Sequence, residues 1–291
     1  MAMRTEPMRN FGLMLLLAVM WGLSIPVTKL GLETMPPLTL TALRFAVAVP
    51  LLFFLVLGKQ RLPWRAFPRV AALGLLGIGL GQVTQTLGVV GTSASVGTVI
   101  SATIPVFVVI FAALRLKQPV SARQALGLLA AFVGIALVAA DNSGDATTAS
   151  PTTLTGVSLL LLSAVAVGFY FVWSVELTSA YGTATVAAWS TFCGFVALLP
   201  WAGWEMSQVP FQVTAEAVGA AVYLGVVVTV AGLFLWIHLL RVVPARTAAS
   251  VQYLQPVVGI VASALMFGDP LGVLFVVGVV LVLVGLALSM A

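Results

Sequence analysis

The chain of 291 residues contains an internal repeat with a constant spacing of 151 residues. Residues 101–119 and 252–270 each carry one proline inside an apolar run and a second proline at its end. A spacing that is kept over several Gly and Pro positions indicates a duplication, so we expect a fold built from two similar halves. The matching pairs are Gly74/Gly225, Gly81/Gly232, Pro105/Pro256, Pro119/Pro270, Gly127/Gly278 and Gly134/Gly285.

The composition places these halves in a membrane. The chain is 61% hydrophobic and 7% charged, whereas soluble domains carry about 25% charged residues. Several uncharged runs reach the ~18 residues that indicate a transmembrane helix. The sequence therefore predicts an all-α integral membrane protein without a separate soluble domain.

Composition also excludes several kinds of function. One cysteine, Cys193, and one histidine, His238, permit no intrachain disulfide and argue against a Cys/His metal site. The net charge of +5 is typical of basic cytoplasmic loops and does not indicate nucleic-acid binding. We expect neither a cofactor nor a metal.

Hydropathy predicts ten transmembrane helices, with short connections between most of them. The longest connection, residues 141–153, is polar and contains Pro, Gly and Ser, as expected of a linker. It separates a first repeat, residues 1–140, from a second repeat, residues 154–291. The predicted spans are 11–32, 38–57, 68–88, 92–114, 122–140, 154–176, 183–204, 215–239, 245–267 and 270–290.

Charged residues near the spans predict the orientation. Eleven of the 13 basic residues fall on one side of a ten-span arrangement, and only Lys29 and Arg44 do not. The positive-inside rule then places both termini in the cytoplasm. Arg4 and Arg9 precede a first span that we expect to be retained rather than cleaved as a signal peptide.

Five spans per repeat is an odd number, so the second repeat enters the membrane from the opposite face. Inverted repeats of this kind are typical of transporters, whose binding sites lie at the repeat interface near the midplane. We therefore expect two inverted five-helix repeats around a central cavity.

Polar and aromatic residues inside the spans are the candidates for the lining of this cavity, because buried amides and hydroxyls need partners or water. The alternative is that part of this set only holds helices together. The predicted substrate-binding residues are Trp21, Ser24, Gln82, Gln85, Ser101, Thr103, Tyr170, Trp173, Gln252, Tyr253 and Gln255. Pro26, Pro105 and Pro256 lie within spans, where each predicts either a hinge or a packing kink.

Two other groups of residues have expected structural roles. The glycines of spans 5 and 10 are seven residues apart, which places each pair on one helix face and predicts close helix packing or a dimer contact. Lys29 and Glu33 are four residues apart near the outer end of span 1, and Arg44 is expected to lie near Glu33 as an anchor at the outer interface. No carboxylate is placed near the midplane, which favours facilitated diffusion over proton coupling.

The order of several short motifs resembles the EamA-type branch of the drug/metabolite transporter superfamily. The motifs are W-G-L-S at 21–24, P-P-L-T-L-T-A-L-R-F at 36–45, A-S-V-G at 94–97, I-P-V-F at 104–107, Y-L-Q-P-V at 253–257 and G-D-P at 268–270. Gln118 departs from the pattern, because the family often has an acidic residue there, whereas Asp269 keeps the acid at the equivalent place in the second repeat.

The resemblance implies a bacterial inner-membrane exporter of small metabolites, with amino acids as the best-known substrates. A multidrug or organic-cation carrier and a nucleotide-sugar carrier are the alternatives within the superfamily. A channel, or a small subunit of a larger complex, is a further alternative. An intramembrane enzyme is disfavoured, because the chain lacks the paired acids, nucleophile–base pair or metal cluster that chemistry needs. The expected partners are a small-molecule substrate and the lipid bilayer, with the protein a monomer or a homodimer.

Overall fold

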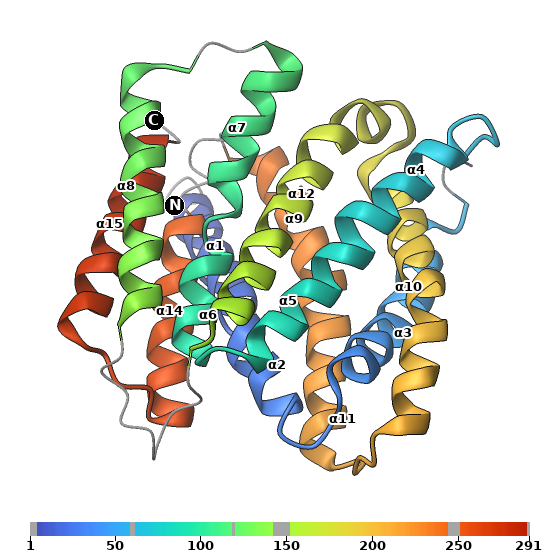
Figure 1. Ribbon diagram of the computed structural model, residues 1–291. Coiled ribbons are helices and arrows are strands. Elements are labelled where there is room, and N and C mark those ends of the chain that lie inside the picture. Colours follow the sequence, from blue (N-terminus) through green and yellow to red (C-terminus); the bar gives the residue numbers. More distant parts are fainter. Residues whose placement is uncertain (1–4, 59–61, 118–119, 142–151, 244–250, 290–291) are drawn as a thin grey trace.

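The structure is a computed structural model that describes residues 5–58, 62–117, 120–141, 152–243 and 251–289. All regular elements within these residues are helical (Figure 1). Eight helical segments are long and apolar enough to cross a membrane, and residues 254–267 and 273–288 form shorter apolar helices. The described part of the chain therefore has the all-α architecture expected of a multi-pass membrane protein.

Within the described residues, each predicted span overlaps one helix or a run of consecutive helical segments, and residues 245–250 of the ninth span lie outside the described residues. The first half contains α1 (Thr5–Gly22), α2 (Ser24–Gly31), α3 (Pro37–Val56), α4 (Phe67–Leu73), η2 (Gly74–Gly79), α5 (Leu80–Val90), α6 (Ala94–Ser101), α7 (Ile104–Leu116) and α8 (Ala122–Ala140). The second half contains α9 (Leu154–Tyr181), α10 (Thr183–Gln208), α11 (Ala215–Val222), η3 (Tyr223–Ala231), α12 (Gly232–Val242), α14 (Val251–Phe267) and α15 (Val273–Ser289).

The connections alternate between the two ends of the bundle. In Figure 1 the end of α7, the start of α8 and the α9–α10 connection lie at the upper end, and the α2–α3, α10–α11 and α14–α15 connections lie at the lower end. This alternation is what a chain that crosses a bilayer repeatedly requires.

Two of the predicted proline hinges mark the start of a helix rather than a kink within one. Span 1 is interrupted at Leu23, and Pro26 is the third residue of α2. Span 4 is interrupted before Ile104, and Pro105 is the second residue of α7. A proline in the first turn removes no helical hydrogen bond, so it is well suited to these positions. Pro256 does lie inside a helix, α14.

Two segments have π-helical geometry, which the sequence pattern did not predict. They are η2 and η3, and they contain Gly74 and Gly225, one of the pairs spaced by 151 residues. Each glycine allows a close backbone approach. A Cβ atom on Gly74 would collide with the Ser190 carbonyl oxygen, and one on Gly225 would lie 2.7 Å from the Arg44 carbonyl oxygen.

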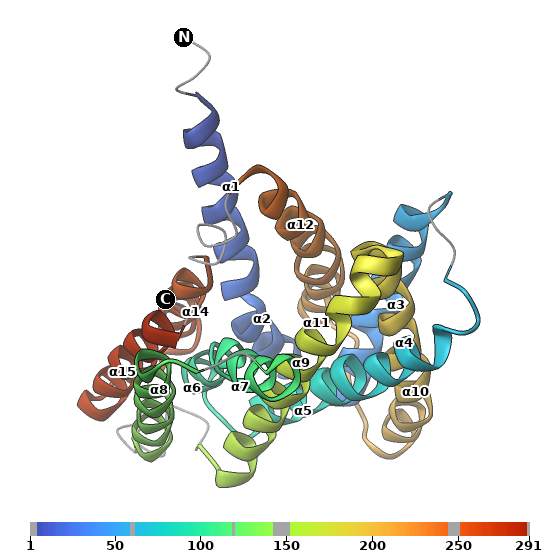
Figure 2. The same ribbon diagram turned by 90° about the horizontal axis from the view of Figure 1, so that it is seen from above.

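The predicted packing of the glycine-bearing helices is confirmed, and it occurs within the chain. Helices α8 and α15 lie side by side at one edge of the bundle (Figures 1 and 2). Gly134 meets Gly278, and Gly285 meets the carbonyl oxygen of Gly127. The small residues let the two backbones approach closely.

Charged side chains at the lower end of the bundle bind helix ends. Glu205 is buried and accepts hydrogen bonds from the Leu38 and Thr39 amides at 3.2 and 2.7 Å, which caps α3. Asp269 accepts from the Ser95 amide at 2.8 Å at the start of α6. Carboxylates at helix N-termini are stabilised by the free N–H groups and by the helix dipole.

Lys29 follows the same principle at a helix C-terminus. Its ammonium group donates to the carbonyl oxygens of Val89 at 3.0 Å and Thr92 at 2.7 Å, at the end of α5. Its hydrogen bonds are therefore to backbone carbonyls rather than to Glu33, which is exposed.

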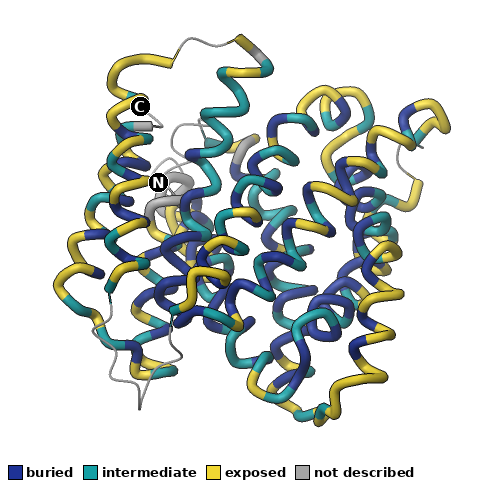
Figure 3. Tube along the Cα trace, in the orientation of Figure 1, coloured by how far each residue is buried: buried dark blue, intermediate teal, exposed yellow. Residues whose placement is uncertain are grey.

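The outer surfaces of the helices are apolar. Leu114 is 72% exposed and Val284 is 46% exposed, and Figure 3 shows exposed positions along the periphery of the bundle, including α8 and α15. Apolar side chains that face outward on every side are expected where the solvent is lipid.

Candidate functional site

The centre of the candidate site is Arg44, a buried guanidinium on α3. Its side chain is only 9% exposed. Nη1 donates to the Gln82 side-chain oxygen on α5 at 2.6 Å, and Nε donates to the Thr229 hydroxyl on η3 at 3.1 Å. Both partners are neutral. These hydrogen bonds therefore fix the guanidinium in place and leave its charge unpaired by a carboxylate within the described residues.

The π-helical geometry of η3 positions Thr229. Gly225 lets η3 approach the α3 backbone at Arg44. The Thr229 hydroxyl donates to the Leu224 carbonyl oxygen, five residues earlier, at 2.8 Å. That bond directs the hydroxyl oxygen so that it can accept from Arg44. π-Helical segments are frequent at functional sites, where they re-aim side chains.

Trp21 on α1 joins the same network through the backbone of η3. Its indole N–H donates to the Val228 carbonyl oxygen at 3.1 Å, and its ring lies 5.9 Å from that of Trp236. Val228 is the neighbour of Thr229. A continuous polar connection therefore links α1, η3, α3 and α5, which come from both halves of the chain.

The structure thus brings together two of the predicted binding residues, Trp21 and Gln82, around a cation that was not in the predicted set. Sequence reasoning placed Arg44 at the outer interface as an anchor, but the side chain is buried among three helices. The signal that pointed to it was its position as one of two basic residues outside the basic loops.

The other predicted residues lie in several places. Tyr170 donates to or accepts from Ser190 at 3.1 Å, between α9 and α10. Ser101 has a buried hydroxyl oxygen without a partner among the described residues, at the end of α6. Thr103 is buried and donates to the Ile100 carbonyl oxygen at 2.6 Å. Ser24 and Gln85 are half-buried.

Three predicted residues lie on α14. Gln255 is half-buried, and its carbonyl oxygen lies against Gly22, next to Trp21. The side chains of Gln252 and Tyr253 fall outside the described residues.

Trp173 belongs to a separate surface. Its ring stacks on Phe169 with centroids 4.5 Å apart, and the Arg115 guanidinium lies 4.9 Å from its ring centroid. The pocket beside it is lined by residues of α4, α7 and α9 and by none of the Arg44 network.

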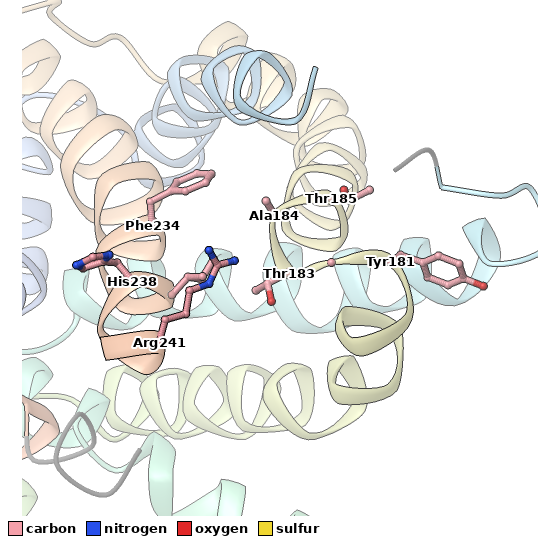
Figure 4. Close-up of a pocket in the computed structure, with 9 residues that line it drawn as sticks. Tyr181, Thr183, Ala184, Thr185, Phe234, His238 and Arg241 are labelled. Atoms are coloured by element: carbon pink, nitrogen blue, oxygen red, sulfur yellow. The ribbon is translucent and has the colours of Figure 1, made fainter. Parts of the chain in front are cut away.

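A cavity of about 440 Å³ opens at the upper end of the bundle, between α12 and the α9–α10 connection. Figure 4 shows Arg241 and Phe234 extending from α12 toward Thr183 and Ala184 at the start of α10. The Tyr181 side chain points away from this gap. The polar groups of the cavity wall therefore include the Arg241 guanidinium, the His238 imidazole and the hydroxyl groups of Thr183 and Thr185.

An apolar layer separates this cavity from Arg44. Ala48, Ala188 and Val230 are buried against one another, with Leu233 and Phe234 packed beside them. Phe234 follows Thr229 by five residues, which is about 7 Å along a helix axis. Thr229 therefore lies roughly one and a half helical turns below the cavity wall at Phe234, behind small and aliphatic side chains.

The chain matches one protein family along most of its length. The family model of the EamA-like transporter family matches residues 10–140 and 154–291. An uncharacterized transporter of Archaeoglobus fulgidus is 26% identical over 96% of this chain and 98% of its own length. The uncharacterized inner membrane transporter YedA of Escherichia coli is 27% identical over 90% and 84% of the two chains.

Two further similarities bear on function and fold. A probable amino-acid metabolite efflux pump of Salmonella typhimurium is 26% identical over 95% of this chain and 93% of its own length. A solved crystal structure superimposes with a TM-score of 0.66 at 17% identity, over 97% of this chain and 96% of that chain. At this identity the structural likeness describes the fold alone.

Proposed function

Because the chain belongs to the EamA-like transporter family, we propose that it exports amino acids or related small metabolites across a bacterial inner membrane by alternating access. The name of the Salmonella relative supports an amino-acid metabolite as cargo, and the name of the E. coli relative supports the inner membrane.

The observation that carries the proposal is the environment of Arg44. A buried cation inside a membrane is costly unless it is paired, and such residues commonly mark a substrate pathway. Gln82 and Thr229 hold the guanidinium through neutral hydrogen bonds. A substrate carboxylate at Arg44 would provide the missing negative charge, and guanidinium groups bind carboxylates in a well-defined geometry.

The proposed site has further groups for the rest of the substrate. Gln85 lies on α5, the helix that carries Gln82. Trp21 lies on α1 and bonds the backbone of η3 beside Thr229. An indole and an amide suit the apolar side chain and the amino group of an amino acid. Within this proposal, Gln82 and Thr229 position Arg44, and Trp21 shapes the site.

The fold is proposed to consist of ten transmembrane helices in two inverted five-helix repeats, 1–140 and 154–291. The two π-helical segments support this, because they contain Gly74 and Gly225, which are separated by the repeat spacing of 151 residues. The contacts of Gly134 with Gly278 and of Gly127 with Gly285 also relate the two halves reciprocally. The distribution of basic residues supports cytoplasmic termini.

In the proposed cycle the present conformation is open toward the cytoplasm. The 440 Å³ cavity lies at the end of the bundle that carries the basic connections. The opposite end is closed by buried contacts of Asp269 and Glu205 with helix N-termini. Substrate reaches Arg44 when the layer around Ala48 and Val230 separates, and it leaves when the outer contacts open.

The proposed transport is facilitative. The described acidic residues that are buried, Glu205 and Asp269, bind helix N-termini at the outer end and do not contact Arg44. His238 lies in the cavity wall, on the far side of the apolar layer from Arg44. A proton-coupled carrier commonly relays protons through acidic or histidine side chains within the membrane.

The test is uptake of a panel of labelled amino acids into liposomes that contain the purified protein, with and without an imposed pH gradient. Saturable uptake that is indifferent to the gradient, and that Arg44→Gln abolishes, is the expected result. Arg65→Gln is the matched control, because Arg65 is an exposed arginine outside the site. Uptake that follows the gradient would contradict the facilitative mechanism.

A second candidate is export of an anionic metabolite such as a nucleotide sugar. Arg241 in the cavity wall favours it, because it adds a second basic group on the route to Arg44. Uptake of nucleotide sugars without uptake of any amino acid would select this alternative. Uptake of neither class, but of organic cations, would contradict the role given to Arg44.

A further inference from the structure

A second pocket lies on the flank of the bundle, between α4, α7 and α9, and we call it the arginine–tryptophan pocket. Its volume is about 370 Å³, and Arg69, Leu73, Arg115, Phe169, Trp173 and Glu176 line it. None of these residues belongs to the Arg44 network or to the cavity at α12. The pocket therefore needs a separate explanation.

Arg115 is held in this pocket but is only partly satisfied. Its Nη2 atom forms an ion pair with the Glu176 carboxylate on α9 at 2.9 Å, and its guanidinium carbon lies 4.9 Å from the Trp173 ring centroid. The Nη1 atom is buried and has no hydrogen-bond partner within the described residues. A buried donor without an acceptor is unfavourable. An acceptor atom in the pocket would remove that cost once the guanidinium rotates to bring Nη1 toward it.

Arg69 supplies a second positive charge from the opposite wall. It lies on α4 and is exposed, and it forms no hydrogen bond or ion pair with the residues that the structure describes. The pocket thus contains two arginines and one carboxylate, which makes it net positive. The Glu176 carboxylate is already engaged with Nη2, and its side chain is 68% exposed.

Exposed apolar side chains adjoin the pocket-lining residues on two of the helical segments. Leu114, next to Arg115 on α7, is 72% exposed, and Leu76 of η2, three residues after Leu73, is 50% exposed. Arg115 lies in the last turn of α7, near the end of the span, and Trp173 lies one turn before Glu176. Tryptophan and arginine at the end of apolar helices are typical of the headgroup level of a bilayer.

We propose that the arginine–tryptophan pocket binds the phosphate of an anionic phospholipid, with the acyl chains lying along the exposed side chains of η2 and α7. Basic pockets between transmembrane helices bind anionic headgroups in this way. The phosphate oxygens accept from Arg115 Nη1 and from Arg69, and the hydroxyls of a phosphatidylglycerol headgroup reach the Glu176 carboxylate. This site is independent of the transported substrate.

The test is native mass spectrometry of the full-length protein in detergent, titrated with phosphatidylglycerol or with phosphatidylcholine. Wild-type protein is expected to bind phosphatidylglycerol more tightly than phosphatidylcholine. Arg69→Gln and Arg115→Gln are each expected to weaken its binding at least about tenfold, because each removes a charge-assisted hydrogen bond. Arg65→Gln, which alters an exposed arginine four residues before Arg69, is expected to bind like wild type.

Other outcomes would overturn the proposal. Equal binding of the two lipids, or equal binding by Arg69→Gln, Arg115→Gln and Arg65→Gln, would show that no specific headgroup site exists. Glycerol 1-phosphate is the probe for a soluble source of the phosphate. If it displaces the lipid and binds as tightly, the occupant is a soluble phosphate ester and the lipid assignment is wrong. Arg69 is exposed, so its variant is expected to fold and the result remains interpretable.

Discussion

Gly134 of α8 and Gly278 of α15 face each other so closely that a Cβ atom on either would lie 2.6 to 2.7 Å from the other's carbonyl oxygen. Neither backbone can move away without separating the helices along the rest of their contact. This pair therefore sets how closely α8 and α15 approach.

Replacing Gly278 by leucine is expected to lower the stability and the yield of folded protein more than the transport rate per folded molecule. Overfilling a packed interface costs about 1 to 3 kcal/mol or more, and here the added atoms meet backbone rather than a mobile side chain. Expression and thermal unfolding in detergent would measure the effect. Gly12→Leu is the control, because a Cβ atom at Gly12 meets nothing within 4 Å. Equal stability of both variants would contradict the packing role.

Replacing Arg44 by lysine is expected to leave the protein folded and to raise the KM for substrate. Lysine keeps the charge but cannot bond Gln82 and Thr229 while presenting a planar face to a carboxylate. An increase of roughly tenfold or more is expected for the loss of a charge-assisted hydrogen bond. Liposome uptake over a range of substrate concentrations would measure it, and an unchanged KM would exclude Arg44 from the binding site.

Two substitutions at Thr229 distinguish the contribution of its hydroxyl group from that of its side-chain volume. Thr229→Val keeps the volume but removes the acceptor of the Arg44 Nε hydrogen bond, so we expect a loss of about 1 to 3 kcal/mol of stability and reduced transport. Thr229→Ser retains the acceptor and is expected to behave nearly as wild type. If the two variants behave alike, the hydrogen bond does not position Arg44.

Trp21→Phe removes the indole N–H that donates to the Val228 carbonyl oxygen but keeps an aromatic ring beside Trp236. A neutral hydrogen bond contributes about 0.5 to 1.5 kcal/mol. We therefore expect a rise in KM of about 2- to 10-fold with little change in expression. A loss of expression without a change in KM would make Trp21 a structural residue only.

Glu205→Gln tests the cap of α3. The carboxylate accepts from two backbone amides and from the Thr39 hydroxyl at 2.8 Å, so its neutralisation is expected to cost about 1 to 2 kcal/mol of stability. Thermal unfolding would measure this. Glu216→Gln is the comparison, since Glu216 is also acidic and lies in the first turn of α11 but is exposed. A similar shift in both variants would contradict a specific cap.

Helix positions and packing glycines were the features most accessible from the sequence. Apolar run length determines where a helix crosses a membrane, and the glycines at 127, 134, 278 and 285 are spaced by two turns on one face. The predicted span at 122–140 coincides with α8. The sixth span was predicted to end near residue 176, but α9 continues to Tyr181, because its last turn is too polar for hydropathy to include.

The π-helical segments and the surroundings of Arg44 were not accessible in this way. A π-helix has no distinctive composition, and glycine in a helix is compatible with either geometry. The position of Arg44 depends on contacts from α5 and η3, which lie 38 and 185 residues further along the chain. Only the folded arrangement distinguishes a buried arginine from one that reaches the interface.

The carboxylates at the lower end of the bundle determine how that end responds to ionic strength. Asp269 and Glu205 are each 8% exposed and bind helix N-terminal amides. Dissolved ions screen exposed charge pairs, but they do not reach buried contacts with peptide groups. We therefore expect these two contacts to persist in concentrated salt, which weakens more exposed ion pairs such as Arg115 with Glu176.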